Sequence, residues 1–143
     1  MSPQSPRAII ESLGLTPHPE GGHYTEIYRA PAEGDARSSV TSIYYLLQAG
    51  ERSAWHRVDA VEIWHFHEGD PLLLGIREEG NDLQSVTLGL DIAAGQQLQA
   101  IVPAHAWQSA RPLGGWTLVG CTVAPGFEFA GFEMAPSGAF PDL

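Results

Sequence analysis

The stretch Ala54-Trp-His-Arg-Val-Asp-Ala-Val-Glu-Ile-Trp-His-Phe-His-Glu-Gly69 holds three of the six histidines of the chain and two runs of strand-forming residues. The runs Ser53–Val58 and Val61–His67 are rich in β-branched and aromatic side chains and are separated by only two residues. We therefore interpret them as neighbouring β-strands.

Side chains alternate between the two faces of a strand, so Glu62, Trp64 and Phe66 share one face. The residues on the opposite face are Val61, Ile63, His65 and His67. A carboxyl group beside two aromatic side chains indicates an apolar interior, and desolvation raises the pKa of such a group unless a cation lies alongside. His56 on the preceding strand is the expected neighbour. His65 and His67 are expected to cover a sheet or line an interface.

The rest of the chain repeats this pattern of short strands between turns. A single helix is predicted over Pro6–Leu13, with Ser5 as its N-cap and Gly14 as its stop. The further predicted strands are Tyr24–Arg29, Val40–Gln48, Leu72–Arg77, Ser85–Leu90, Gln97–Val102, Trp107–Arg111, Trp116–Val123 and Phe132–Met134. Many short strands at this spacing predict an all-β fold of two antiparallel sheets, a jelly roll with one short N-terminal helix.

Composition narrows the class of protein. The 143 residues suit one domain, 1–143, and the hydrophobic fraction of 43% supports a packed core. The net charge is −10 and all basic residues are arginines, which argues against nucleic acid or an anionic membrane as partner and against chemistry that needs a lysine. No apolar run reaches membrane-spanning length and no secretion signal precedes the helix, so we expect a cytoplasmic protein.

Two motifs resemble those of the cupin superfamily. The first is His56, then Glu62, then Gly69, and the second is Gly95 to Gln108, which contains Pro103-Ala-His-Ala-Trp-Gln108. Together with Pro19-Glu-Gly-Gly-His-Tyr24, these motif sequences are similar to those of cupin family 5, a branch of short single-domain cupins without an established reaction. The resemblance runs from the first helix to Phe132 and implies a cupin-type double-stranded β-helix.

The resemblance also locates the metal-binding positions of cupins, which are typically three histidines and one glutamate. Here the four positions fall on His56, Val58, Glu62 and Gln108, and the motif glycine falls on His105. Valine cannot coordinate a metal and an amide is a weak ligand. We therefore predict no metal cofactor, with a divalent metal as the alternative.

The pocket residues follow from parity and resemblance together. His56, Glu62 and Gln108 occupy the positions that face the cavity in cupins, and Trp64 and Phe66 are predicted to form its apolar wall. His56 and Glu62 are the candidate catalytic residues, with His56 as the general base, and Gln108 is a candidate for orienting a substrate oxygen or a water. His18 and His23 are interpreted as loop residues, with a lid beside Glu20-Gly21-Gly22 as the alternative.

Three functions remain open on the sequence. Cupin-fold dTDP-sugar epimerases are similar in using a pocket histidine without a metal, which favours a sugar epimerase or isomerase with Glu26 and Arg29 as substrate contacts. The alternatives are a non-catalytic binding module for a small apolar or aromatic ligand and a metal-dependent cupin enzyme. The strand Ser42–Leu47 is apolar on both faces, so we also expect a homodimer, as in related cupins.

Overall fold

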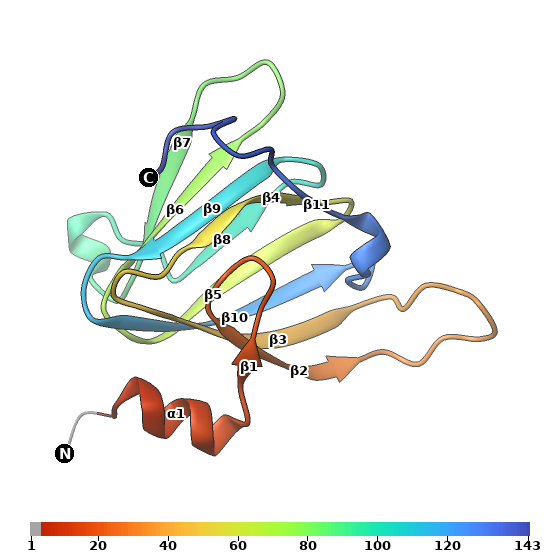
Figure 1. Cartoon of the computed structure of the whole chain (residues 1–143), viewed down its shortest axis with the longest axis horizontal. Coiled ribbons are helices and arrows are strands. Elements are labelled where there is room, and N and C mark those ends of the chain that lie inside the picture. Colours follow the sequence, from red (N-terminus) through yellow and green to blue (C-terminus); the bar gives the residue numbers. More distant parts are fainter. Residues whose placement is uncertain (1–3) are drawn as a thin grey trace.

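The computed structural model describes residues 4–143 (Figure 1). Helix α1 (Pro6–Leu13) begins and ends as predicted: Ser5 Oγ accepts a hydrogen bond from the Ala8 amide at 3.1 Å, and Gly14 has the left-handed φ of 69°. Its buried Ile9 packs with Leu46 on the outside of the sandwich. A helix this short depends on such contacts for its stability.

The strands form two antiparallel sheets that face each other (Figure 1). The six-stranded sheet has the order β1 (Thr16–Pro17), β2 (His23–Arg29), β3 (Thr41–Gln48), β10 (Trp116–Ala124), β5 (Val61–Gly69) and β8 (Gln99–Val102). The five-stranded sheet has the order β11 (Phe132–Met134), β4 (Ser53–Val58), β9 (Trp107–Pro112), β6 (Leu72–Arg77) and β7 (Gln84–Leu88). Two single-turn 3-10 helices, Ile92–Ala94 and Phe129–Gly131, complete the elements. The predicted jelly roll is confirmed.

The predicted strands match the observed ones with small differences at their ends. The one strand that sequence reasoning missed is β1, whose two residues pair with Tyr24 and His23. A strand of this length shows no alternation, so its pattern could not be seen. It matters because it begins the loop that returns into the sandwich.

The outer face of β5 confirms the predicted parity. At a bulge, Leu118 pairs with Glu68 and Val119 with Phe66, so His67 has no partner residue on β10. The bulge does not turn His67 inward, because its imidazole occupies the space left by Gly120, where a Cβ atom would lie 2.6 Å from Nε2.

The C-terminal segment covers the outer face of the five-stranded sheet. Trp55 Nε1 donates to the Pro141 carbonyl at 3.0 Å, and the Phe140 ring lies between the rings of Trp55 and Trp107, at 5.4 and 5.6 Å. Trp55 is therefore a packing residue on the side of β4 that faces away from the interior.

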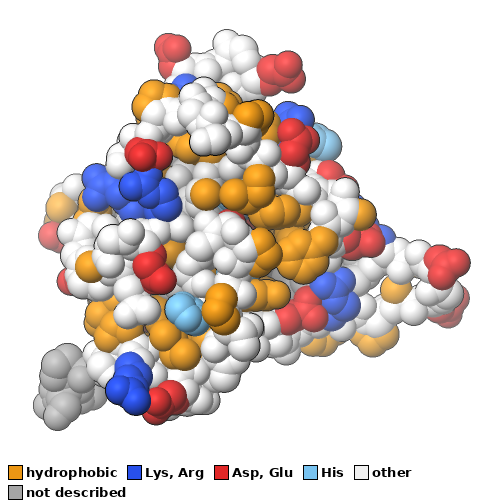
Figure 2. All heavy atoms as spheres, in the orientation of Figure 1, with side chains coloured by type: hydrophobic (Ala, Val, Ile, Leu, Met, Phe, Trp, Pro, Cys, Tyr) orange, Lys and Arg blue, Asp and Glu red, His pale blue; other side chains and the backbone are white. Residues whose placement is uncertain are grey.

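The long connection between β2 and β3 projects from the body of the molecule (Figure 1), and acidic side chains lie at its tip (Figure 2). Exposed carboxylates such as those of Glu33 and Asp35 account for part of the acidic balance of the chain. Within residues 4–143, no helix has the length and apolar character needed to cross a membrane.

Candidate functional site

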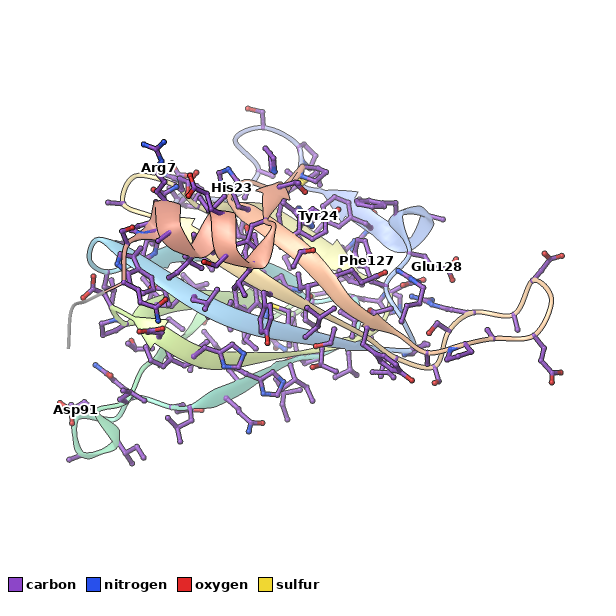
Figure 3. All side chains as sticks on the ribbon, turned by 90° about the horizontal axis from the view of Figure 1, so that it is seen from below. Arg7, His23, Tyr24, Asp91, Phe127 and Glu128 are labelled. Atoms are coloured by element: carbon purple, nitrogen blue, oxygen red, sulfur yellow. The ribbon has the colours of Figure 1, made fainter. Side chains whose placement is uncertain are left out.

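A cavity of about 250 Å³ opens at one end of the sandwich, between the two sheets. Its polar lining residues are His18, Glu20, Tyr24, Glu26, Arg29, Thr41, His56, Glu62 and Cys121. Its apolar lining residues are Ile43, Val58, Val123, Phe127 and Phe129. Figure 3 shows Tyr24 on β2 and Phe127, in the segment after β10, on the same side of the sandwich. The cavity thus has a polar floor and an aromatic rim.

His56 lies on β4 opposite Gln108 of β9, and its side chain is 1% exposed. Its Nδ1 is 2.8 Å from the Ala54 carbonyl oxygen, which can only accept a hydrogen bond. Burial lowers the pKa of His56, although the neighbouring Glu62 opposes this shift. The neutral ring therefore carries its proton on Nδ1, and Nε2 is left as the basic nitrogen.

Glu62 is held by a chain of two hydrogen bonds inside the sandwich. Trp64 Nε1 donates to Gln108 Oε1 at 2.9 Å, and Gln108 Nε2 donates to Glu62 Oε1 at 3.0 Å. Burial raises the pKa of Glu62 to about 7, an effect that the nearby His56 opposes. This carboxyl group can therefore gain or lose a proton near neutral pH.

Glu20 reaches the same cavity from the loop between β1 and β2. The loop is closed by hydrogen bonds from the His18 amide to the Gly22 carbonyl and from the Ala54 amide to the Glu20 carbonyl, at 2.9 and 2.8 Å. Gly21 has a φ of 113°, and a Cβ atom there would lie 2.1 Å from the Arg52 carbonyl oxygen. Only glycine permits this close approach.

The Glu20 carboxyl lies between two imidazole rings. Its Oε1 is 3.4 Å from His18 Nδ1 and its Oε2 is 3.4 Å from His56 Nδ1, while Ser53 Oγ donates to Oε2. Burial raises the pKa of Glu20 to about 8, so this group holds its proton at neutral pH.

His18 is the second imidazole of the cavity. Burial lowers the pKa of His18 to about 4, and the nearby His56 adds to this effect. Its Nδ1 accepts a hydrogen bond from the Glu20 amide at 3.1 Å, so the neutral ring carries its proton on Nε2. The ring meets Tyr24 edge to face, with centroids 4.4 Å apart.

Glu26 and Arg29, the predicted substrate contacts, lie at the cavity mouth. Arg29 Nη2 is 2.7 Å from Glu26 Oε1 and donates to the Phe127 carbonyl at 3.0 Å. Among the described residues, Arg29 is the one basic side chain apart from the histidines in the lining, and its charge is already paired.

Trp64 and Phe66 lie on the Glu62 face of β5, as parity predicted, but they do not line the cavity. Both belong to the packed core with Leu72 and Leu74, so the expectation that they form the apolar wall is wrong. Along β5 the cavity ends at Glu62, and the next two inward side chains belong to the packed core. Gln108 also lies behind Glu62 rather than on the cavity surface.

The cavity contains two residues that sequence reasoning placed in an ordinary loop. His18 is 8% exposed, and the side chain of Glu20 is 9% exposed at the cavity floor. His23 begins β2 outside the cavity. The paired glycines that follow Glu20 were the available signal, because they allow a loop to enter a site closely. Sequence reasoning left a lid at this loop as the alternative, and it did not predict that the loop places His18 and Glu20 inside the sandwich.

The residues at the cupin metal positions do not fit a metal ion. Val58 offers no donor atom, and both polar atoms of Gln108 are engaged by Trp64 and Glu62. In residues 4–143, no group of three or more histidine, cysteine, aspartate or glutamate side chains is arranged to hold a metal ion. The backbone supports this assignment of the motif positions. His105 stands where the cupin motif has glycine, and it has the left-handed φ of 70° that glycine favours.

Several solved structures are similar to this chain. A protein of Shewanella oneidensis is 40% identical, with a TM-score of 0.88 over 92% of this chain and 85% of the other. A hypothetical protein from Leishmania major is 30% identical, with a TM-score of 0.86 over 92% of this chain and 88% of the other. A dTDP sugar isomerase from Desulfovibrio desulfuricans shares the fold, at 16% identity and a TM-score of 0.61 over 81% of this chain and 85% of the other.

Comparison with functionally curated proteins gives no significant match. The family model described as Cupin superfamily (DUF985) matches residues 7–135, which is nearly the whole chain. With the two antiparallel sheets and the two cupin motifs in place, the chain belongs to the Cupin_5 family of the cupin superfamily.

Proposed function

We propose that this protein is a metal-independent isomerase or epimerase of small carbonyl sugars, in which His56 removes the proton next to the carbonyl carbon. The observation that carries the proposal is the tautomer of His56: its Nδ1 is committed to the Ala54 carbonyl, which makes Nε2 the basic nitrogen. A neutral imidazole inside a cavity is a suitable general base near neutral pH.

The size and charge of the cavity suggest the ligand. About 250 Å³ accommodates a molecule of monosaccharide size, and the lining divides into hydrogen-bonding and apolar groups. The paired Arg29 leaves no free cation in the described lining for a diphosphate, which favours a neutral sugar over a nucleotide sugar. Glu62 is assigned to a substrate hydroxyl, since its pKa of about 7 lets it donate or accept.

Exchange with deuterated water tests this reaction. Ketoses from dihydroxyacetone to fructose are incubated with the protein in the presence of a chelator, and deuterium at the carbon next to the carbonyl is followed by NMR. His56→Asn keeps a donor near the position of Nδ1 but removes the base, so exchange should fall by at least ~100-fold. His105→Asn, an exposed histidine outside the cavity, is the matched control and should retain wild-type rates.

A second function is supported by the cavity rim. Phe129 is 54% exposed and lies beside Phe127 at the mouth, with ring centroids 4.9 Å apart. An exposed aromatic pair suits a binding module for a small apolar or aromatic ligand. No deuterium incorporation into any ketose, together with thermal stabilisation by such a ligand, would replace the isomerase by this alternative.

We also propose that the chain forms a homodimer through the outer face of the six-stranded sheet. The outward positions on its β5, β8 and β10 side are mostly uncharged. They include Val61, Ile63, His65, His67, Gln99, Ile101, Gly120 and Thr122, and Glu68 beside α1 is the acidic exception. Ile101 is 63% exposed. Because each chain has a net charge of −10, an uncharged face is where two copies meet with the least repulsion.

Sedimentation tests the dimer. The wild-type protein should sediment at twice the 15.4 kDa chain mass, and Ile101→Glu should sediment as a monomer with an unchanged circular dichroism spectrum. Leu90→Glu, at a 70% exposed position outside this face, is the control and should stay dimeric. A wild-type monomer at micromolar concentration would contradict the proposal.

A further inference from the structure

The cavity floor contains a continuous row of titratable groups. His56 comes from β4, and Glu20 and His18 come from the loop after β1. Among residues 4–143, the ion pairs of the Glu20 carboxyl are to these two histidines and not to an arginine. The two oxygens of this carboxyl each approach the Nδ1 atom of a different ring at 3.4 Å. The other groups that face it are Ser53, which donates to it, Tyr45 and Glu62.

The two rings have opposite tautomers. The Ala54 carbonyl fixes a proton on His56 Nδ1, whereas the Glu20 amide fixes a lone pair on His18 Nδ1. A protonated carboxyl group is complementary to both rings. Its carbonyl oxygen, Oε2, can share the Nδ1 proton of His56 with the Ala54 carbonyl, and its hydroxyl, on Oε1, can share the His18 Nδ1 lone pair with the Glu20 amide. The donors and acceptors therefore run in one direction, from His56 Nε2 to His18 Nε2.

We propose that Glu20 is a proton relay that joins His56 to His18, so that the base and the acid of the reaction belong to one contiguous row of groups that can carry a proton. This proposal rests on the function proposed above. It assigns the acid that protonates the carbonyl oxygen to His18 and makes Glu20 a positioning residue that also carries the proton between the rings.

The transfer balances without a net change of charge. His56 Nε2 takes the proton from the substrate carbon, and the Nδ1 proton of His56 passes to Glu20 Oε2. The Oε1 proton of Glu20 passes to His18 Nδ1, and the Nε2 proton of His18 passes to the substrate carbonyl oxygen. The C–H electron pair becomes the new C=C bond of an enediol, and the carbonyl π pair becomes the new O–H bond. Reversal at the neighbouring carbon completes an isomerisation.

A relay of this kind is consistent with a cavity floor whose described groups, His18, Glu20 and His56, are neutral. In a buried site, separating an imidazolium ion from an enolate is costly because the low dielectric does not stabilise either ion. Simultaneous loss and gain of a proton at each group avoids both ions. The burial of Glu20 and the depressed pKa of both histidines are consistent with groups that stay neutral.

Glu20→Gln is the decisive variant because glutamine keeps the size of the side chain, with one acceptor and one donor for the two rings, and cannot pass a proton. Its amide oxygen accepts from His56 and its NH₂ donates to His18. With the ketose panel, kcat for deuterium exchange should fall by at least ~100-fold while KM stays within about threefold. A plot of the wild-type rate against the deuterium fraction of the solvent should be curved, because several protons move together, and this curvature should be lost in the variant. Glu20→Ala serves as the comparison that loses the hydrogen bonds as well.

Nitrogen-15 NMR of the histidine rings measures the tautomer of each ring and so tests the hydrogen-bond directions of the relay without any turnover. In the wild-type protein at neutral pH, His56 should be protonated on Nδ1 and His18 on Nε2, and Glu20→Gln should preserve both tautomers. Equal tautomers in the two rings would overturn the relay whatever the activity. An active wild-type protein with an equally active Glu20→Gln variant would overturn the relay and leave the proposed function. Opposite tautomers without exchange of any ketose would overturn the function and, with it, the catalytic role of the relay.

Discussion

The interior of the sandwich has two halves that differ in how they are built. The half around Trp64, Leu72 and Leu74 is made almost entirely from strands and is closely packed. The half around His56 and Glu62 is completed by a loop, and it encloses a cavity with titratable groups. Both halves contain side chains from the same inward face of β5, two residues apart.

The difference shows what places a binding cavity in this fold. Along β5, Trp64 is covered by both sheets, whereas Glu62 lies where the sheets separate and the loop after β1 inserts Glu20. Strand parity decides whether a side chain points inward, but the position along the strand decides whether it meets packed side chains or a cavity.

The largest effect should come from the packed half. Trp64→Ala removes a side chain that is 1% exposed and leaves Gln108 Oε1 without its donor, so the free energy of unfolding should fall by about 3–5 kcal/mol. Urea titration followed by circular dichroism measures the change. Phe129→Ala at the half-exposed cavity rim is the control and should cost less than about 1 kcal/mol. Equal costs at both positions would remove the distinction between the halves.

The next effect belongs to the cavity and depends on pH. An acid whose pKa is raised by folding binds its proton more tightly in the folded state, so its stabilisation is complete below the unfolded pKa and is lost as pH rises through the folded pKa. Glu20 and Glu62 rise from 4.5 to pKa values of about 8 and about 7. Between pH 6.5 and about 9, stability should therefore fall by about 2–3 kcal/mol.

The buried histidine His18 lowers the stability of the folded state on the acid side of this pH range. The pKa of His18 falls from 6.5 to about 4 on folding, so its stabilisation is present above pH 6.5 and is lost as pH falls toward 4. Denaturant titrations at a series of pH values measure the profile. Glu20→Gln and Glu62→Gln should each flatten the alkaline decline, and a wild-type profile that is flat between pH 6.5 and about 9 would contradict the buried neutral carboxyls.

The smallest effect tests the loop that distinguishes the halves. Gly21→Ala places a Cβ atom against the Arg52 carbonyl oxygen at a φ of 113°, so we expect a loss of about 1–2 kcal/mol and displacement of Glu20 from the cavity. The NMR signals of His18 and His56 should shift, while those of the Trp64 indole should not. Gly80→Ala, a glycine with a φ of 80° and no neighbour within 4 Å, controls for strain alone.

Much of the fold could be predicted because short-range patterns carry it. Helix Pro6–Leu13 and the strands Ser53–Val58, Leu72–Arg77 and Phe132–Met134 have the predicted bounds, since capping residues, turns and period-two alternation are local signals. The pairing of His56 with Gln108 across β4 and β9 agrees with the two cupin motifs. The assignment of Trp64 and Phe66 to the cavity failed because depth within the sandwich is not a local property.

The sequence by itself determined that the strands alternate, that Glu62 points inward with His56, and that Val58 and Gln108 replace two metal ligands. Only the tertiary structure decided that the loop after β1 folds back into the sandwich, because that depends on how closely Gly21 and Gly22 approach β3 and β4. It also decided the chemistry of the site. The pKa of each buried group depends on its distance from groups far away in sequence, and the tautomer of each ring depends on which backbone atom lies beside it.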